Sequence, residues 1–276
     1  MLAANVRKNT ILDFFVQPLM MIYSHYALLI KVVKRDLRSR YIGSFLGLYW
    51  STISPIAMLT AYAVVYIFIF HAKAYGFTSL QYVLFIFSGL VPYLGFADAV
   101  STSLTSIVSN SSLVKNTLFP IELIPVKSVF VSQAGQAAGF FILFLALLAT
   151  KQLSWYILYL PLIWLIQLIF TIGLMWILSS LNVFFRDLQY AINIILMIMM
   201  MLSPISYSIS MVPHALKILI MLNPFSYLIV AYQDILVFHK VPDVTIILAL
   251  LVMSSSLFFI GYYIINRTKV LFAEYV

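Results

Sequence analysis

The sequence predicts an all-α integral membrane protein with six transmembrane helices. Hydrophobic residues make up 64% of its 276 positions, charged residues only 9%, and the mean hydropathy is +1.07. A soluble domain is roughly 45–50% apolar and about 25% charged, so a water-soluble fold would not hide this much apolar surface. Helices are the expected form because every backbone N–H and C=O group in lipid must be paired inside its own segment.

Charge-poor stretches place the predicted spans. A helix needs about 20 apolar residues to cross the hydrocarbon core, and six stretches are that long: 44–70, 82–107, 127–150, 155–183, 188–207 and 244–266. They occupy most of the chain, so residues 1–276 are predicted to form one membrane domain. It would consist of a cytoplasmic N-terminal segment (1–43), the six-span bundle (44–266) and a cytoplasmic tail (267–276).

The distribution of lysine and arginine predicts how the bundle is oriented in the membrane. One side of the predicted topology carries Lys73, Lys151, Lys217 and Lys240. The other side carries Arg7, Lys8, Lys31, Lys34, Arg35, Arg38, Arg40, Lys115, Lys127, Arg186, Arg267 and Lys269. Because cytoplasmic loops are enriched in these residues, both termini are predicted to be cytoplasmic. Topology and contact with anionic membrane lipids then explain the net charge of +8, and nucleic acid is not an expected partner.

The segment before the first span is predicted to be an amphipathic helix on the cytoplasmic membrane surface. Basic residues gather on one face of its helical wheel and apolar residues on the other: Lys31, Lys34, Arg35 and Arg38 against Leu29, Val32, Val33 and Leu37. Asp36 and Arg40 lie four residues apart on the apolar face, where we expect them to pair.

This helix is expected to mark the entrance of whatever the protein moves. We assign contact with an anionic headgroup or phosphate to its basic residues, namely Lys31, Lys34, Arg35, Arg38 and Arg40. The alternative is a helix that only anchors the chain to the membrane, because basic amphipathic helices commonly do so.

The cytoplasmic loop at 110–127 reads NSSLVKNTLFPIELIPVK and is predicted to hold a short helix with a hard stop at its prolines. Its apolar side chains would lie in water unless another protein covers them, and exposed apolar patches usually mark a contact. We therefore expect a partner to dock on Leu113, Val114, Lys115, Leu118 and Phe119. A loop packed against its own chain is the alternative.

Residues 202–238, on the outer side, are too apolar for an ordinary loop, yet Pro204, Pro213 and Pro224 prevent one regular spanning helix. Two short re-entrant or interfacial helices are predicted here. Irregular backbone at membrane depth is tolerated only where it is buried in protein or lines an aqueous cavity. The region is therefore expected to form the outer mouth of a path, or else a structural lid.

Aromatic residues indicate a candidate translocation path along the first span. If the helix is regular, one side of it and of its entry carries Tyr41, Phe45, Tyr49, Tyr62, Tyr66 and Phe70. Sugars stack their C–H faces on such rings, so a glycan would be held by many weak contacts. Core packing explains an aromatic stripe equally well.

Asp98 is the clearest ionisable residue inside a predicted span. Intramembrane charges are functional candidates, so we add Asp98 to the path. Ser101, Thr102 and Ser103 lie close by in sequence, and a hydrogen-bonded polar seam is the alternative to a water-filled cavity. The four histidines show no ligand spacing, so no metal site is predicted.

Three stretches together resemble the permease subunits of ABC-2 type exporters, in particular those that move O-antigen, capsular polysaccharide or teichoic acid. The stretches are RDLRSRYIGSFLGLYWSTISPIAM (35–58), VSNSSLVKNTLFPIELIPV (108–126), and a third that runs from FFRDL (184–188) through SPISYS and VPHALKILIMLNPFSYLIVAYQDIL to residue 236. The resemblance implies a homodimer in the bacterial cytoplasmic (inner) membrane, two copies of a cytoplasmic ATP-binding subunit, and a polyprenyl-linked glycan as substrate. It also implies that residues 113–119 are the region coupled to the ATPase.

The chain has no ATP-binding loop of its own. No glycine is followed by lysine, so the phosphate-cradling motif G-x-x-x-x-G-K-[ST] is absent. We therefore predict a transport subunit and not an enzyme, without a cofactor, with ATP and Mg bound by the partner. Two small-xxx-small pairs, Gly43 with Gly47 and Gly135 with Gly139, permit close helix approach between two subunits or within one.

The predicted function is export of a lipid-linked polysaccharide, with O-antigen ahead of capsule or teichoic acid. An ABC-2 exporter of a lipid or drug and a secondary transporter are further alternatives. A secondary transporter would show internal repeats and midplane ionisable groups, of which only Asp98 is a candidate. A membrane-embedded transferase would show convergent acids or a histidine near one interface, and the sequence shows none.

Overall fold

The computed structural model describes residues 11–40, 43, 45, 47, 50–65, 76–115, 119–207 and 212–275, which form helices and no strand. In chain order the elements are α1 (Ile11–Ser24), α2 (Tyr26–Ser39), α3 (Trp50–Val64), α4 (Ser79–Leu104), α5 (Ser106–Ser109), α6 (Ser111–Lys115), α7 (Leu123–Ala149), the 3-10 helix η3 (Trp155–Tyr159), α8 (Leu160–Phe184), α9 (Leu188–Leu202), α10 (His214–Leu222), α11 (Pro224–Leu236) and α12 (Val244–Tyr275). The predicted all-α class is confirmed for these residues.

Four helical segments are long and apolar enough to cross a membrane. They are α4, α7, η3 with α8, and α12, and they coincide with the predicted spans at 82–107, 127–150, 155–183 and 244–266. The chain is thus a multi-pass α-helical membrane protein. The predicted span at 188–207 contains the shorter helix α9, of 15 residues. Only part of the predicted span at 44–70 is described, as α3, so the number of six stays a prediction.

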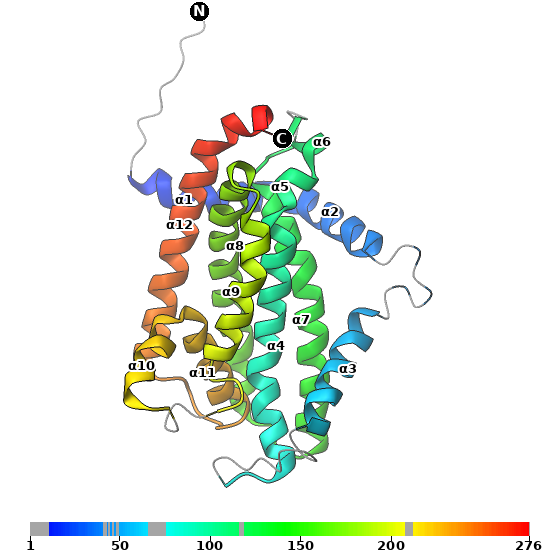
Figure 1. Cartoon of the computed structure of the whole chain (residues 1–276), viewed down its shortest axis with the longest axis vertical. Helices are drawn as coiled ribbons and strands as arrows, with labels where there is room; N and C mark the ends of the chain where they lie inside the picture. The colour runs from blue at the N-terminus through cyan, green and yellow to red at the C-terminus, as the bar shows by residue number, and fades with distance from the viewer. Residues whose placement is uncertain are drawn as a thin grey trace, which may run out of the picture.

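The long helices run side by side and the short ones gather at the two ends of the bundle (Figure 1). At one end lie α1, α2, α5, α6 and the C-terminal end of α12; at the other lie α10 and α11. α1 and α2 meet at an angle of 64°, and the pair is apolar enough to count as one broken span. α2 points away from the bundle and α3 stands beside it, next to α4 and α7.

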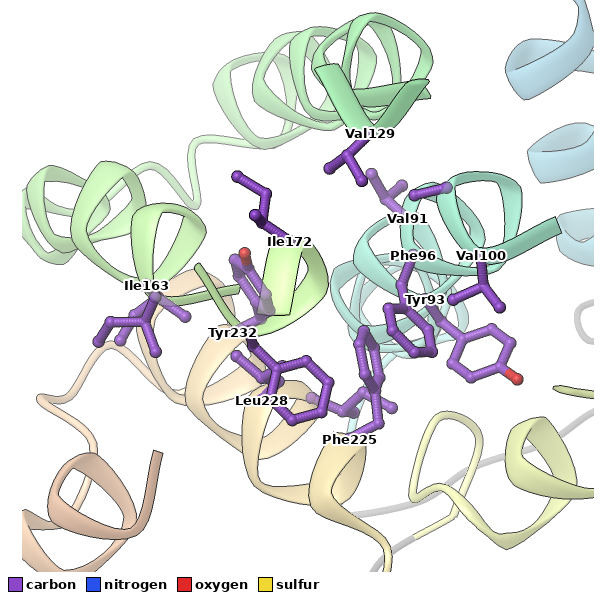
Figure 2. Close-up of a cluster of buried hydrophobic side chains, with 14 of the residues drawn as sticks. Val91, Tyr93, Phe96, Val100, Val129, Ile163, Ile172, Phe225, Leu228 and Tyr232 are labelled. Atoms are coloured by element: carbon purple, nitrogen blue, oxygen red, sulfur yellow. The ribbon is translucent and has the colours of Figure 1, made fainter. Parts of the chain in front are cut away.

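α4 is the centre of the bundle, and most of its side chains are buried. Its Tyr93 and Phe96 meet Phe225 of α11, whose ring lies 4.4 Å from that of Phe96 and 5.4 Å from that of Tyr93, measured between centroids. Figure 2 shows this cluster, with Leu228 and Tyr232 continuing it along α11. Such offset and edge-to-face pairs add about 0.5–1.5 kcal/mol each beyond the area they bury.

A buried polar network crosses the same core. The Gln167 side chain of α8 donates to the Pro92 carbonyl (3.0 Å) and exchanges hydrogen bonds with Gln136 of α7 (3.0 and 3.1 Å). Tyr232 donates its hydroxyl to Gln167 Oε1 at 2.6 Å. Because lipid offers no hydrogen-bond partners, these groups are satisfied by one another and thereby join four helices.

Glycines set the closest helix contact, between α8 and α12. A Cβ on Gly173 would lie 2.4 Å from the Phe258 backbone nitrogen, and one on Gly261 would lie 2.2 Å from the Gly173 carbonyl oxygen. Two glycine pairs were predicted to let helices approach closely. The first, Gly43 with Gly47, was wrong, because their φ values of +83° and +51° lie outside the right-handed helical region. Gly139 packs internally against Val91, whereas nothing lies within 4 Å of a Cβ on Gly135.

The segment between α9 and α12 contains two short helices, and their re-entrant or interfacial placement stays a prediction. α10 and α11 are separated at Asn223, whose side chain caps α11 by accepting from the Phe225 backbone N–H at 3.0 Å. Pro224 occupies the first turn of α11, where its missing N–H is not needed. α11 is almost wholly buried, whereas α10 exposes Ile218, Met221 and Leu222.

Candidate functional site

A cavity of about 450 Å³ lies between α2, α3, α4 and α7. Its lining is mostly apolar, with small residues on α7 and several polar side chains: Leu37, Arg40, Trp50, Ser54, Met58, Leu59, Val91, Leu94, Gly95, Asp98, Val131, Ser132, Gly135, Gln136 and Gly139. Gly135 and Gly139 of α7 leave room in the cavity, because neither has a side chain. Ligand sites are typically concave and apolar with a few placed polar groups, which this lining matches.

An ion pair between α2 and α4 lies in this cavity. Arg40 Nη1 donates to Asp98 Oδ2 at 2.9 Å and Arg40 Nη2 donates to Asp98 Oδ1 at 2.5 Å. The two parallel bonds form the bidentate arrangement that suits a guanidinium and a carboxylate. The two side chains are 36% and 33% exposed, so the pair is only partly withdrawn from solvent.

A short polar seam continues from Asp98 toward α7. Thr102 donates to the Asp98 carbonyl oxygen at 2.7 Å, and its hydroxyl lies 3.0 Å from that of Ser132. Asp98 therefore both borders a cavity and lies beside a hydrogen-bonded seam. The sequence had left these two environments as alternatives.

Of the five predicted entry residues, only Arg40 lines the cavity. Lys31, Lys34, Arg35 and Arg38 lie exposed on α2. These residues do form a helix, with Leu29 buried on its other face, while its place on the membrane surface stays a prediction. The basic side chains thus form a charged surface leading along α2 to Arg40, at its C-terminal end.

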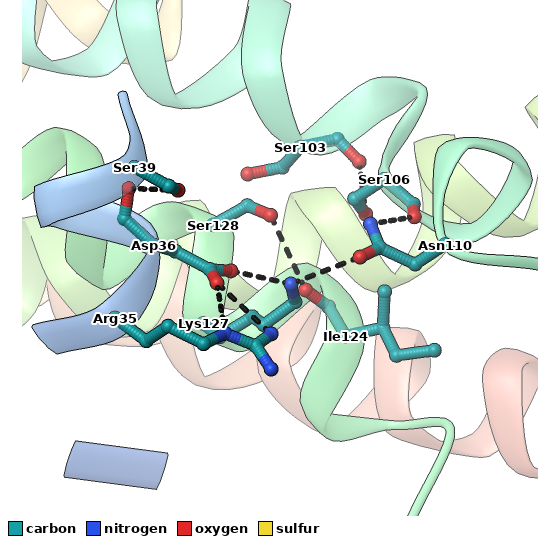
Figure 3. Close-up of polar contacts among 9 residues, drawn as sticks. All are labelled: Arg35, Asp36, Ser39, Ser103, Ser106, Asn110, Ile124, Lys127 and Ser128. Atoms are coloured by element: carbon teal, nitrogen blue, oxygen red, sulfur yellow. Dashed lines mark hydrogen bonds and ion pairs between the residues drawn. The ribbon is translucent and has the colours of Figure 1, made fainter. Parts of the chain in front are cut away.

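The expected ion pair between Asp36 and Arg40 was wrong, because each side chain binds a different residue. The Arg40 guanidinium binds Asp98 instead, while Asp36 Oδ2 accepts from Lys127 Nζ of α7 at 2.5 Å. Arg35 donates to Asp36 Oδ1 at 3.1 Å. Figure 3 shows the Lys127 ammonium between Asp36 and the side chain of Asn110. Tertiary partners replaced the local one because α2 packs against α7 and the Arg40 side chain reaches Asp98 of α4.

The aromatic stripe is only partly described. Tyr41, Tyr49, Tyr66 and Phe70 lie outside the described residues. Phe45 is fully exposed, and Tyr62 on α3 is half-buried against the core. A different aromatic residue, Trp50 at the start of α3, lines the cavity. Trp50 was not among the predicted residues of the stripe.

The predicted docking segment contains the short helix α6 and is partly covered by its own chain. Val114 is buried, and Leu113 and Phe119 are half-buried against the core. The chain itself thus covers Val114 and partly covers the other two, as the alternative of a self-packed loop expects, while docking of a partner stays a prediction. Lys115 is exposed, and Leu118 lies outside the described residues. The second proline of the loop, Pro125, lies in the first turn of α7, where proline is tolerated.

A helical membrane bundle with a charged cavity between its helices has the architecture of an integral membrane transport protein. The chain belongs to the ABC-2 type transporter family, whose model matches residues 27–237. The match begins in α2 and ends just after α11, so it includes every helix that lines the cavity.

Relatives extend the similarity over nearly the whole chain. It is 29% identical over 256 residues to the O-antigen export system permease protein RfbA of Myxococcus xanthus, covering 92% of this chain and 96% of that protein. Two proteins of the same name from Klebsiella pneumoniae are each 31% identical over 252 residues, covering 90% of this chain and 95% of theirs.

Proposed function

We propose that this chain is the membrane-spanning subunit of an ATP-driven exporter that moves a lipid-linked polysaccharide of O-antigen type across the cytoplasmic membrane. The observation that carries the proposal is the coverage of the match. About nine-tenths of this chain aligns with nearly all of three relatives named as O-antigen export permeases. An alignment of that extent includes the cavity and both ends of the bundle, and not merely a shared helix pattern.

The cavity supports an entry role for Arg40. A lipid-linked glycan presents a phosphate between its apolar chain and its sugars, and an arginine fork matches phosphate as well as carboxylate. Asp98 is the anion that a phosphate would replace on Arg40. Exchange of this partner is inexpensive, because ion pairs that are partly exposed contribute only about 0–1 kcal/mol.

The rest of the lining suits the remainder of such a substrate. Leu59, Val91 and Leu94 offer an apolar wall for a polyprenyl chain, while Trp50 offers a ring face and Ser54 a hydroxyl for sugars. The basic surface of α2, from Lys31 to Arg38, would attract anionic headgroups and phosphates toward Arg40 by charge.

The missing ATP-binding loop supports a separate ATP-binding partner, and the family resemblance supports the pairing of two copies of this chain. We propose that two copies of this chain form a homodimer and that each binds one copy of a cytoplasmic ATP-binding subunit, which holds ATP and Mg. The exposed side of α6, with Ser112 and Lys115, is the contact for that subunit. The segment is held against the bundle by the side chains of Leu113, Val114 and Phe119. Both termini are cytoplasmic in this arrangement.

The proposal is tested with the purified complex of this chain and its ATPase in proteoliposomes. ATP hydrolysis is measured with polyprenyl-linked O-antigen polysaccharide, capsular polysaccharide or teichoic acid added in turn. We expect the O-antigen polymer to stimulate hydrolysis and to become accessible on the far side of the membrane. Stimulation by one of the other two polymers alone would overturn the substrate, and stimulation by none would overturn the export function.

A further inference from the structure

Lys127, near the start of α7, is a buried cation that the proposed path does not use. Its side chain is 4% exposed and its neighbours Val126 and Val129 are fully buried. Lysine is almost never buried without a partner, because the unpaired charge is costly in a low-dielectric interior. Its two partners come from different segments: Asp36 Oδ2 of α2 at 2.5 Å, and Asn110 Oδ1 of the segment between α5 and α6 at 3.1 Å (Figure 3).

Asn110 fixes the beginning of the proposed docking helix. Its carbonyl oxygen accepts from the backbone N–H groups of Leu113 (2.9 Å) and Val114 (3.2 Å) in α6. Its side-chain amide donates to the Ser106 carbonyl of α5 at 2.7 Å. A shift of α6 therefore moves Asn110, and with it one of the two groups that hold the Lys127 ammonium.

Asp36 connects the same ammonium to the cavity. One turn further along α2, the Arg40 backbone N–H donates to the Asp36 carbonyl at 3.0 Å, and the Arg40 side chain holds Asp98. A continuous series of bonds thus leads from α6 through Asn110, Lys127 and Asp36 to the cavity.

We propose that Lys127 is a positioning residue that couples α6 to α2, so that displacement of α6 by the ATPase changes the position of Arg40 against Asp98. The inference rests on the proposed function in taking α6 as the contact for the ATPase. The physical reason is that moving α2 away from α7 would leave the buried Lys127 ammonium without its anion, and moving Asn110 away would leave it without its second partner. The two segments therefore move together, and the partly exposed Arg40–Asp98 pair is the weaker contact that yields.

The test uses distances between spin labels in the full complex with its ATPase. The chain contains no cysteine, so it adds no background label of its own. Three exposed positions are replaced in pairs: Ser112→Cys on α6, Ile30→Cys on α2, and Leu158→Cys on η3 at the opposite end of the bundle. Pulsed electron resonance then gives the distances from α6 and from α2 to the η3 reference, with ADP and with a non-hydrolysable ATP analogue.

In the otherwise unaltered chain, we expect the ATP analogue to shift both distances. With Lys127→Met, the α6 distance should still shift, whereas the shift of the α2 distance should be lost. Exchanging the charges, with Asp36→Lys and Lys127→Asp together, should restore it. The matched control is Lys240→Met, which removes the partner of the buried Asp234 carboxylate, 3.3 Å away, at the other end of the molecule. It should leave both shifts unchanged.

The outcomes separate this inference from the function on which it rests. If α6 does not respond to nucleotide in the unaltered chain, the docking assignment fails. If α6 responds and α2 continues to respond in Lys127→Met, the coupling through Lys127 is overturned while the export function stands. Should Lys127→Met fail to fold, Asp36→Asn weakens the same ion pair at its more exposed partner and is expected to reduce the α2 shift alone.

Discussion

Arg40 holds both carboxylate oxygens of Asp98, although the two residues lie 58 positions apart and on different helices. The contact brings a cation of the basic helix α2 into a cavity that α3, α4 and α7 complete. Arg40, which was assigned to substrate entry, and Asp98, which was assigned to the translocation path, therefore belong to one site. Its two charges neutralise each other, and a competing ion of either sign can exchange with one of them.

The first prediction concerns the affinity of this site for phosphate. Asp98→Asn removes the anion that competes for Arg40, so binding of polyprenyl phosphate to the purified chain should become about two- to fivefold tighter, and Arg40→Gln should weaken it by a similar factor. Titration with a fluorescent polyprenyl phosphate measures both. Lys217→Gln on α10, at the other end of the bundle, serves as the control. Equal affinities for all four proteins would show that Arg40 does not bind the phosphate.

The second prediction concerns Tyr62, the half-buried aromatic residue of α3. If its ring contacts the passing glycan, Tyr62→Ala should slow export about two- to tenfold, because ring contacts contribute roughly 0.5–1.5 kcal/mol. Tyr62→Phe keeps the ring and should export at the normal rate. Full-length polysaccharide appearing at an unchanged rate in Tyr62→Ala would exclude this residue from the path.

The third prediction concerns the glycine contact between α8 and α12. Gly173→Ala or Gly261→Ala would press a Cβ against backbone atoms that have no room to move, and each should lower the stability by about 1–3 kcal/mol. Gly135→Ala adds the same methyl group where nothing lies within 4 Å, and should be neutral or slightly stabilising. Thermal unfolding in detergent compares the three variants. The close contact would be refuted by equal midpoints.

The fourth prediction concerns the C-terminal end of α12. Phe272 is 0% exposed and contacts Phe184, whereas Val270 is 76% exposed. Phe272→Ala should therefore cost about 3–5 kcal/mol, while Val270→Ala should have little effect. Both are measured by unfolding of the purified chain. A stable Phe272→Ala would mean that residues after 266 form a free tail and not a packed extension of the helix.

The fifth prediction concerns pH and Asp234, near the end of α11. Burial raises the pKa of this carboxyl, with Asp243 adding to the effect and Lys240 opposing it. Oδ2 has no hydrogen-bond partner among the described residues. Since the folded-state pKa lies above the value of about 3.9 for an unfolded chain, folding favours the protonated form. The stability that protonation provides is lost as pH rises from about 4 through the raised pKa.

Asp234→Asn should accordingly gain in stability relative to the unaltered chain as pH increases over that window, because the amide is never charged. Asp187→Asn, at an exposed position, should show no such trend. Unfolding midpoints at a series of pH values provide the measurement. A difference between Asp234→Asn and the unaltered chain that stays constant with pH would contradict the raised pKa.

Some features follow from local chemistry and were readable from residue order. The spans at 82–107, 127–150, 155–183 and 244–266 arise because long apolar segments must form helices in lipid, whatever their neighbours. The basic face of α2 follows from its helical period, and the break between α10 and α11 follows from Pro224. The family resemblance was likewise legible from three stretches read in order, since it depends on residues and their spacing.

The site itself depended on distant contacts. Arg40 was expected to pair with Asp36 because local spacing is all that a helical wheel represents. The packing of α2 against α7, with the Arg40 side chain on Asp98 of α4, gave each residue a different partner. The burial of Val114 and the partial burial of Phe119 likewise depend on packing that local spacing does not represent. Lys127 looked like one more cytoplasmic charge until its burial between Asp36 and Asn110 was visible. Helix formation is a local balance that the sequence determined alone, whereas the partner of each charge is decided by which helices the folded bundle brings together.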